Sequence, residues 1–188
     1  MPARTRSVRV LFGALAASLA ALGLAGCGKD NPVKVIPPAP FQYPAFDTPQ
    51  HAILNVKYAW ERRDSVRTRM AYDDAYQGRS TDSYQVLMFT KNQEVSTVWA
   101  MGKNQDIVRV QFTTSPENTW VRQHYASDPD GWAAIQIQGV NIQVDDAVQG
   151  TLIASGMAFF EFKLTPTLDS SSPTDTTWKV IGWTEIKN

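Results

Sequence analysis

The residue with the clearest chemistry is Cys27, the only cysteine in the 188-residue chain. It directly follows an uncharged apolar run, residues 10–26, in which Ser18 is the only polar side chain. Three arginines precede this run, and no acidic residue occurs before Cys27. A basic start followed by an apolar stretch is typical of a secretory signal. The sequence therefore predicts export, with one thiol at the end of the signal.

The tripeptide Leu24-Ala25-Gly26 before Cys27 resembles the bacterial lipobox. In that family the thiol takes a diacylglycerol group, a peptidase cuts before the cysteine, and the new amine is acylated. The resemblance implies that residues 1–26 are a signal peptide and that a lipid on Cys27 anchors the mature chain. This anchoring is expected to be stable, because a single acyl chain binds a membrane only reversibly whereas Cys27 would carry several. The alternative is an uncleaved membrane helix, because the apolar run has about the minimum length for a helix that spans a bilayer.

The resemblance also implies a location in the bacterial cell envelope. In enterobacterial lipoproteins an aspartate after the cysteine favours retention in the inner membrane, whereas this chain has Gly28. The expected location is therefore the outer membrane, facing the periplasm.

The charge of the mature chain limits the kinds of partner that it is expected to bind. Three of the 18 basic residues leave with the signal and all 18 acidic residues remain, so the mature chain carries a net charge of about −3. A nucleic-acid partner would call for a clustered basic excess, and the sequence therefore predicts none. With its only cysteine lipidated, the domain has no intramolecular disulfide. Its stability must come from packing, for which it has six Trp, six Tyr and eight Phe residues.

The chain after Cys27 divides into a tether and one domain. Residues 27–47 are rich in proline and show no helical or strand periodicity, which indicates an extended linker. Phe41, Tyr43 and Phe46 are many aromatic residues for a free linker, so its end is expected to pack on the domain. Residues 48–188 are long enough for a single domain with a real core.

Three helices are expected at the start of the domain. Thr48 before Pro49 predicts an N-terminal cap for a helix that ends near residue 63, and Asp64 can cap a second, short helix. That second helix is expected to give way near residues 73–74 to a turn through Gly78. The capping box of Thr90 and Gln93 predicts a third helix, up to about residue 102. Its expected apolar face contains Val95, Val98 and Trp99.

Strands are expected before the third helix and throughout the rest of the chain. The predicted ranges are residues 84–89, 107–114, 119–126, 132–138, 140–144, 151–164 and 177–187. Residues 128–131 predict the sharpest turn, and residues 165–176 a surface loop. Gly156 and the consecutive Phe159 and Phe160 indicate a bulge or bend in the long strand.

The pattern indicates neither a metal nor a cofactor. His51 and His124 are far apart in sequence, and neither has a second His or Cys at the spacing of a metal site. Residues 128–131 have Trp132 where a calcium loop needs its third acid, so they are expected to form a turn. Asp145 and Asp146 are expected to lie in a solvent-exposed turn at the end of a strand. The glycine-rich motifs that bind phosphates and dinucleotides are missing.

Two helices, a strand, a helix and a run of long strands predict an α+β domain with helices on one face of the sheet. At this level the chain resembles the nuclear-transport-factor-2-like superfamily, also called SnoaL-like or cystatin-like cone proteins. The resembling segments are residues 58–64, residues 72–76 and the final strand at residues 178–183. The resemblance implies N-terminal helices packed on a strongly curved antiparallel sheet around a cone-shaped cavity.

Isomerase and cyclase members of this superfamily move a proton with an acid, or an acid and a tyrosine, in an apolar cone. The resemblance makes Tyr58, Tyr72, Asp74 and Tyr76 candidate pocket residues, with Asp73 beside them. The alternative is that the tyrosines are core or rim residues and the aspartates lie in water. No catalytic residue is carried over from the family.

The leading hypothesis is a non-enzymatic, lipid-anchored envelope protein whose cone-like domain binds a small apolar ligand or a partner protein. One alternative is a proton-transfer enzyme of the isomerase, cyclase or dehydratase type. Another is a purely structural envelope adaptor, with the cone filled by its own Trp and Phe side chains. A homodimer that pairs through the open sheet face is compatible with each of these.

Overall fold

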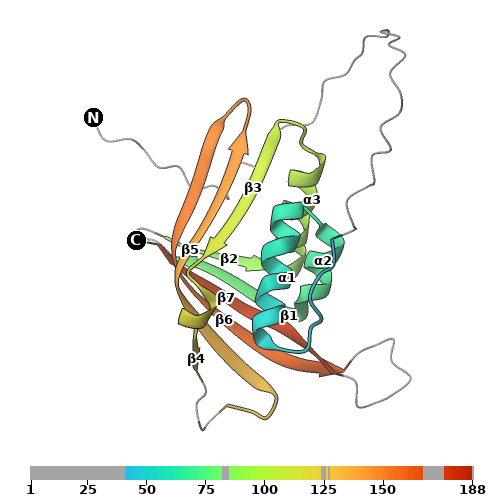
Figure 1. Ribbon diagram of the computed structural model, residues 1–188, viewed down its shortest axis with the longest axis vertical. Coiled ribbons are helices and arrows are strands. Elements are labelled where there is room, and N and C mark those ends of the chain that lie inside the picture. The colour runs from blue at the N-terminus through green and yellow to red at the C-terminus, as the bar shows by residue number, and fades with distance from the viewer. Residues whose placement is uncertain (1–40, 82–84, 124–125, 127, 167–175, 188) are drawn as a thin grey trace, which may run out of the picture.

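The computed structural model describes residues 41–81, 85–123, 126, 128–166 and 176–187. The predicted signal peptide, Cys27, most of the predicted tether and His124 lie outside the described residues. Within the described part of the chain, three α-helices cover one face of a large curved sheet (Figure 1). The predicted α+β class and the helices packed on a strongly curved sheet are confirmed.

The three helices begin where their predicted caps lie. Helix α1, Pro49–Arg62, begins after Thr48, whose hydroxyl accepts the backbone N–H of His51. Helix α2, Ser65–Ala71, begins after Asp64, whose carboxylate accepts the N–H of Arg67. Helix α3, Lys91–Lys103, has the complete capping box of Thr90 and Gln93. These caps satisfy N–H groups that the first turn of a helix leaves unpaired.

The sheet has seven strands in the described residues, in the order β2-β1-β7-β6-β5-β3 with β4 on β5. The strands are β1 Tyr72–Thr81, β2 Val86–Thr90, β3 Ile107–Thr114, β4 Val121–Gln123, β5 Trp132–Asp146, β6 Gly150–Pro166 and β7 Thr176–Lys187. Most neighbours are antiparallel, but β1 pairs with β7 in parallel. The sheet is therefore mixed, and the last strand lies in its interior.

The predicted turn through Gly78 is wrong. Helix α2 ends at Ala71, and the chain continues directly into β1, which pairs with β2 on one side and β7 on the other. In β1 the side chains of Tyr76 and Ser80 are buried and alternate with exposed ones. This period of two is a strand signal that the acidic residues before Tyr76 obscure.

Two further predictions need correction. Residues 132–138 and 140–144 form the single strand β5, with a register shift between Ile137 and Val140 that leaves Gly139 in a bulge. This shift lies opposite Gly156, and a second one lies at Glu161 and Phe162, so the predicted irregularity of the long strand is present in its pairing. Of the strand predicted at residues 119–126, the described residues show β4 at Val121–Gln123, and a 3₁₀ turn at Glu117–Thr119 precedes it.

Trp99 is also not where the sequence pattern placed it. The buried residues of α3 are Glu94, Val95, Val98 and Met101, whereas the Trp99 side chain is 55% exposed. The buried stripe thus lies one position away from Trp99, and an acid takes the place of an apolar residue at its start.

Candidate functional site

The concave face of the sheet is filled by aromatic side chains beneath α1. Trp183 of β7 stacks on Phe112 of β3 and Phe160 of β6, with ring centroids 5.6 and 5.1 Å apart. Trp60 of α1 meets Trp183 edge-on at 6.0 Å. All four side chains are buried. The protein's own rings therefore occupy the space beneath α1.

A very small cavity lies near one end of β5, β6 and β7. Its volume is about 10 Å³, and its lining includes Val140, Ile142, Gly156 and Glu185. Ligand pockets usually measure about 300–1,000 Å³. This cavity is too small for an organic ligand, and it is close to the limit for one water molecule.

A buried acid and two tyrosines form a polar cluster at the interior of the domain. Glu94 of α3 is 2% exposed, and its Oε1 accepts a hydrogen bond from the Tyr76 hydroxyl at 3.2 Å. The ring of Tyr72 stacks on that of Tyr76, with centroids 4.2 Å apart. Both tyrosines are buried. A carboxyl group with a hydroxyl partner in an apolar surrounding can hold or transfer a proton.

Gly78 of β1 makes room for this cluster. A Cβ atom at position 78 would lie 2.6 Å from the Tyr76 hydroxyl oxygen and 3.1 Å from Glu94 Oε1. Real Cβ atoms essentially never approach a heavy atom to within 3.0 Å. The strand therefore needs a glycine at this position for the tyrosine and the acid to meet.

The predicted pocket residues separate into two groups. Tyr72 and Tyr76 lie together in the interior, whereas the Asp74 side chain is 98% exposed and forms an ion pair with Lys91 at 2.8 Å. The hydrogen bond from Lys91 lowers the pKa of Asp74. Tyr58 lies on the other side of α1, edge-on to Phe41. Only the two tyrosines of β1 therefore contribute to the buried cluster.

Asp73, the acid considered beside Asp74, has a local structural role. Its carboxylate accepts the backbone N–H of Ala75 at 3.0 Å and the hydroxyl of Thr165 at 3.3 Å. These contacts link the start of β1 to the end of β6.

Glu94 was not among the residues singled out from the sequence. The signal that identifies it is helical spacing, because residues 94, 98 and 101 recur at four and three and share one face of α3. An acid on the same stripe as Val98 and Met101 must either break the pattern or be buried with a partner.

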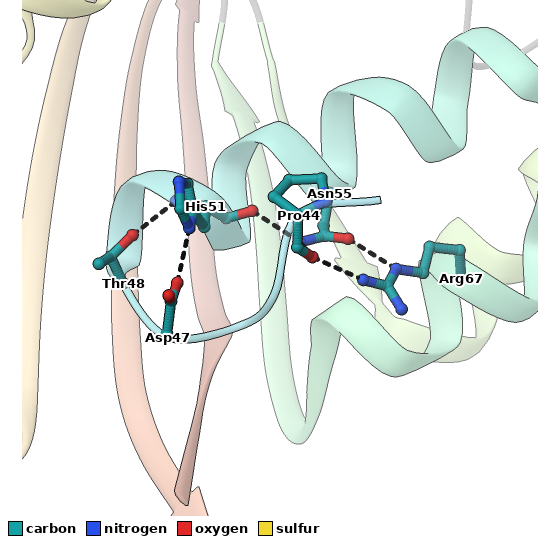
Figure 2. A network of polar contacts seen from close by, with 6 residues as sticks. All are labelled: Pro44, Asp47, Thr48, His51, Asn55 and Arg67. Carbon is teal, nitrogen blue, oxygen red and sulfur yellow. Dashed lines mark hydrogen bonds and ion pairs between the residues drawn. The ribbon is translucent and has the colours of Figure 1, made fainter. Parts of the chain in front are cut away.

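A second polar network fixes the end of the tether to the helices, as expected from its aromatic residues. Arg67 of α2 donates to the Pro44 carbonyl at 2.9 Å and to Asn55 Oδ1 at 2.6 Å (Figure 2). The Asn55 amide, fully buried on α1, donates to the carbonyls of Pro44 and His51. The guanidinium also lies over the ring of Phe46, 4.4 Å from its centroid. Packing of the domain-proximal tether is thereby confirmed.

Neighbouring contacts extend this network. The Tyr43 hydroxyl donates to Asp64 at 2.9 Å, and burial together with this hydrogen bond raises the pKa of Tyr43 to about 12. His51 Nδ1 lies 2.6 Å from Asp47 Oδ1, and the hydrogen bond lowers the pKa of Asp47 (Figure 2). His51 thus belongs to the start of α1 and faces the tether.

The face of the sheet opposite the helices carries an apolar patch. Residue pairing across β2, β1, β7 and β6 places Val86, Thr81, Ile186 and Met157 in one row. The next row contains Met88 and Phe159. We define Val86, Met88, Met157, Phe159 and Ile186 as the outer-face patch. The side chains of Val86, Met88 and Ile186 are 46–55% exposed.

The described residues lack two other kinds of feature. None of their helices is both long and apolar enough to cross a membrane. They also contain no group of three or more His, Cys, Asp or Glu side chains that could hold a metal ion.

Comparison with solved structures identifies the class of fold. The chain is similar to a nuclear-transport-factor-2-like protein of unknown function in nutrient uptake from Rhodospirillum rubrum. The TM-score is 0.53 and the identity 9%, over 76% of this chain and 99% of that one. The described domain therefore has the nuclear-transport-factor-2-like cone fold, as the resemblance noted in its sequence implied.

Two other neighbours have similar scores. A protein from Novosphingobium aromaticivorans, provisionally named a scytalone dehydratase, gives a TM-score of 0.54 and 9% identity over 74% of this chain and 80% of that one. A conserved protein from Planctomyces limnophilus gives a TM-score of 0.52 and 11% identity, over 73% of this chain and 91% of that one. No protein-family model matches the sequence, and no curated protein matches it. At such identities the likeness concerns the fold alone.

Proposed function

We propose that this chain is a non-enzymatic, lipid-anchored protein of the bacterial cell envelope whose cone-like domain binds another protein molecule. The single observation that carries the binding role is the contrast between the two faces of the sheet. The concave face is filled by Trp60, Phe112, Phe160 and Trp183, whereas the convex face exposes the outer-face patch. An exposed apolar patch on a soluble domain marks an interaction surface.

The partner can be an envelope protein or a second copy of this chain. Strands β2, β1, β7 and β6 present the outer-face patch as a continuous surface, and such a surface can pair with a copy of itself about a two-fold axis. Arg79 and Thr184 lie between the apolar residues in the row of Met88 and Phe159, and they supply polar contacts. Pairing of two sheets is therefore compatible with the composition of this face.

The test is native mass spectrometry of the protein extracted from its membrane in mild detergent. Wild type should retain a second copy or one stoichiometric protein partner, and Ile186→Lys should lose it because a charge then lies in the patch. Val148→Lys is the matched control, since Val148 is 76% exposed in the turn between β5 and β6. A monomer without a protein partner, or one that retains a small apolar molecule, would overturn the proposal.

The lipid anchor is tested separately. Its support is the lipobox-like sequence at Cys27, which lies outside the described residues. Cys27→Ser should move the protein from the membrane to the soluble fraction and abolish incorporation of labelled palmitate. Continued membrane association of this variant without lipid would instead favour the uncleaved helix.

A proton-transfer enzyme is the second candidate, and the buried pair of Glu94 and Tyr76 favours it. Such a role requires a carboxyl group whose pKa is raised toward neutrality. Carbon-13 NMR of labelled glutamate, with Glu94→Gln to assign the signal, measures that pKa directly. A Glu94 pKa near the ordinary value for glutamate would exclude this candidate.

A further inference from the structure

A groove separates helices α2 and α3 on the side of the domain that faces away from the sheet. Its volume is about 390 Å³. The lining residues are Ser65, Val66, Arg69, Val95, Ser96 and Trp99. Val66, Arg69, Ser96 and Trp99 are exposed, whereas Val95 is buried at the base of the groove.

Large apolar side chains stand at the edges of the groove. Val66 and Met70 on α2 are 70% and 48% exposed, and Trp99 on α3 is 55% exposed. Lys103 Nζ lies 6.0 Å from the centroid of the Trp99 ring. An exposed tryptophan beside a lysine is typical of surfaces that meet a membrane interface, where the ring is apolar and one end remains wet.

The charged residues on the exposed stripes of α2 and α3 are basic. The exposed stripe of α2 is formed by Val66, Arg69 and Met70, and that of α3 by residues 92, 96, 99 and 103. Arg69 and Lys103 are the only charged residues on these two stripes. The mature chain as a whole has a net charge of about −3. The exposed acid nearest to Arg69 is Asp74, and it is already paired with Lys91 at the start of α3. The basic residues here therefore outnumber the acid, and a locally positive surface on a negative protein fits an anionic partner.

The end of the tether lies close to this groove. Phe41, the first described residue, packs its ring against the Arg62 guanidinium at 4.1 Å, and Arg62 precedes the groove residue Ser65 by one short turn. A fully extended chain from Cys27 to Phe41 reaches roughly 50 Å at most. A lipid on Cys27 therefore keeps the groove close to the membrane in which it is inserted.

We propose that the α2–α3 groove docks on the surface of the bilayer that holds the anchor. Trp99, Val66 and Met70 lie in the interfacial region, and Arg69 and Lys103 contact anionic phospholipid headgroups. A short tether gives an effective concentration in the millimolar range, so a contact too weak to hold a free domain is sufficient here. The inference rests on the proposed lipid anchor, and it leaves the outer-face patch on the opposite side, turned toward a partner.

The test uses the full lipidated chain, reconstituted in vesicles of phosphatidylethanolamine with phosphatidylglycerol. Because Cys27 is the only cysteine and is acylated under the proposal, Ser96→Cys can be labelled alone with a fluorophore. Ser155→Cys is the matched control, an exposed serine on the outer face of β6. Headgroup-attached nitroxide lipids should quench the label at position 96 much more strongly than the label at position 155.

The charge dependence is tested with Arg69→Gln and Lys103→Gln together. Loss of two basic contacts should weaken the docking equilibrium about 30-fold on the anionic vesicles. Pure phosphatidylcholine vesicles should have the same effect on the unmodified chain. Asn92→Cys, on the same stripe of α3, provides a second labelling site should Ser96→Cys not fold.

Equal quenching at positions 96 and 155 would overturn the inference, as would quenching at position 96 that ignores lipid charge. Protection of position 96 only when an envelope protein is added would also overturn it, and would assign the groove to that partner. In each case the protein would still float with the vesicles, so the lipid anchor would stand. A chain that does not incorporate into vesicles at all would instead contradict the anchor.

Discussion

At the scale of single residues, the contact between Tyr76, Glu94 and Gly78 is the most constrained part of the interior. Gly78→Ala would place a methyl group 2.6 Å from the Tyr76 hydroxyl oxygen. We expect the free energy of unfolding to fall by about 1–3 kcal/mol, the usual cost of overpacking. Urea denaturation measures this loss.

The partner substitution separates a steric cause from a general effect of alanine in a strand. Tyr76→Phe removes the oxygen that the new methyl group would meet, so the double variant should lose less stability than the sum of the two single variants. Additive losses would show that the steric explanation is wrong.

Tyr43 makes the stability of the folded protein depend on pH in the alkaline range. Burial and the hydrogen bond to Asp64 raise the pKa of Tyr43 from 10.0 to about 12. The folded state thus binds this proton more tightly than the unfolded state. The associated stability is fully present below pH 10 and is lost as the pH rises from 10 to 12.

Absorbance titration of the tyrosines should therefore include a component near pH 12 that belongs to Tyr43. Tyr43→Phe should remove that component and flatten the decline of stability across the same pH window. If the absorbance change near pH 12 is as large in Tyr43→Phe as in the wild type, the assignment is contradicted.

At the scale of elements, Arg67 joins the tether to both helices of the α1–α2 hairpin. Arg67→Lys keeps the charge but loses the planar fork that reaches Pro44 and the buried Asn55 at once. The expected loss of stability is about 1.5–3 kcal/mol, the range for hydrogen bonds to charged groups. Hydrogen exchange should show the accompanying loss of protection at Asn55.

Arg69→Lys is the control for this change, because Arg69 lies on the same helix with its side chain exposed. That substitution should stay within about 0.5 kcal/mol of wild type. Equal losses in the two variants would show that the fork of Arg67 does not fix the tether.

The elements also show which parts of the fold the sequence could predict. Thr48, Asp64 and the pair Thr90–Gln93 identify the helix starts because capping depends on residues three positions apart. The strand at Tyr72–Thr81 was missed because its burial depends on β7, about a hundred residues later in the chain. The same limit applies to the parallel pairing, which no local pattern specifies.

The candidate site was predictable only in part for a related reason. Tyr72 and Tyr76 were identified from their residue type, but Asp74 faces solvent and Glu94 replaces it in the interior. Which acid is buried depends on how α3 rotates against β1, and that rotation is fixed by tertiary packing. The exposure of Trp99 follows from the same rotation.

At the scale of the whole molecule, the sheet depends on its last strand. β7 lies between β1 and β6, and it carries Trp183 into the aromatic cluster. A chain ending at residue 175 leaves the β1–β2 hairpin unpaired from the remaining strands. It should show no cooperative unfolding transition in urea, whereas a cooperative transition in this truncated chain would contradict the central role of β7.

The position of β7 also has a consequence for when the protein folds. Gly78 of β1 pairs with Trp183 of β7, so the pairing of these two strands cannot form while β7 is still inside the ribosome. Contacts between such distant parts of a chain make folding slow. A nascent chain of this sequence therefore cannot close its sheet before β7 has been synthesised, and this delay suits the export proposed above, since a chain must be unfolded to be threaded across a membrane.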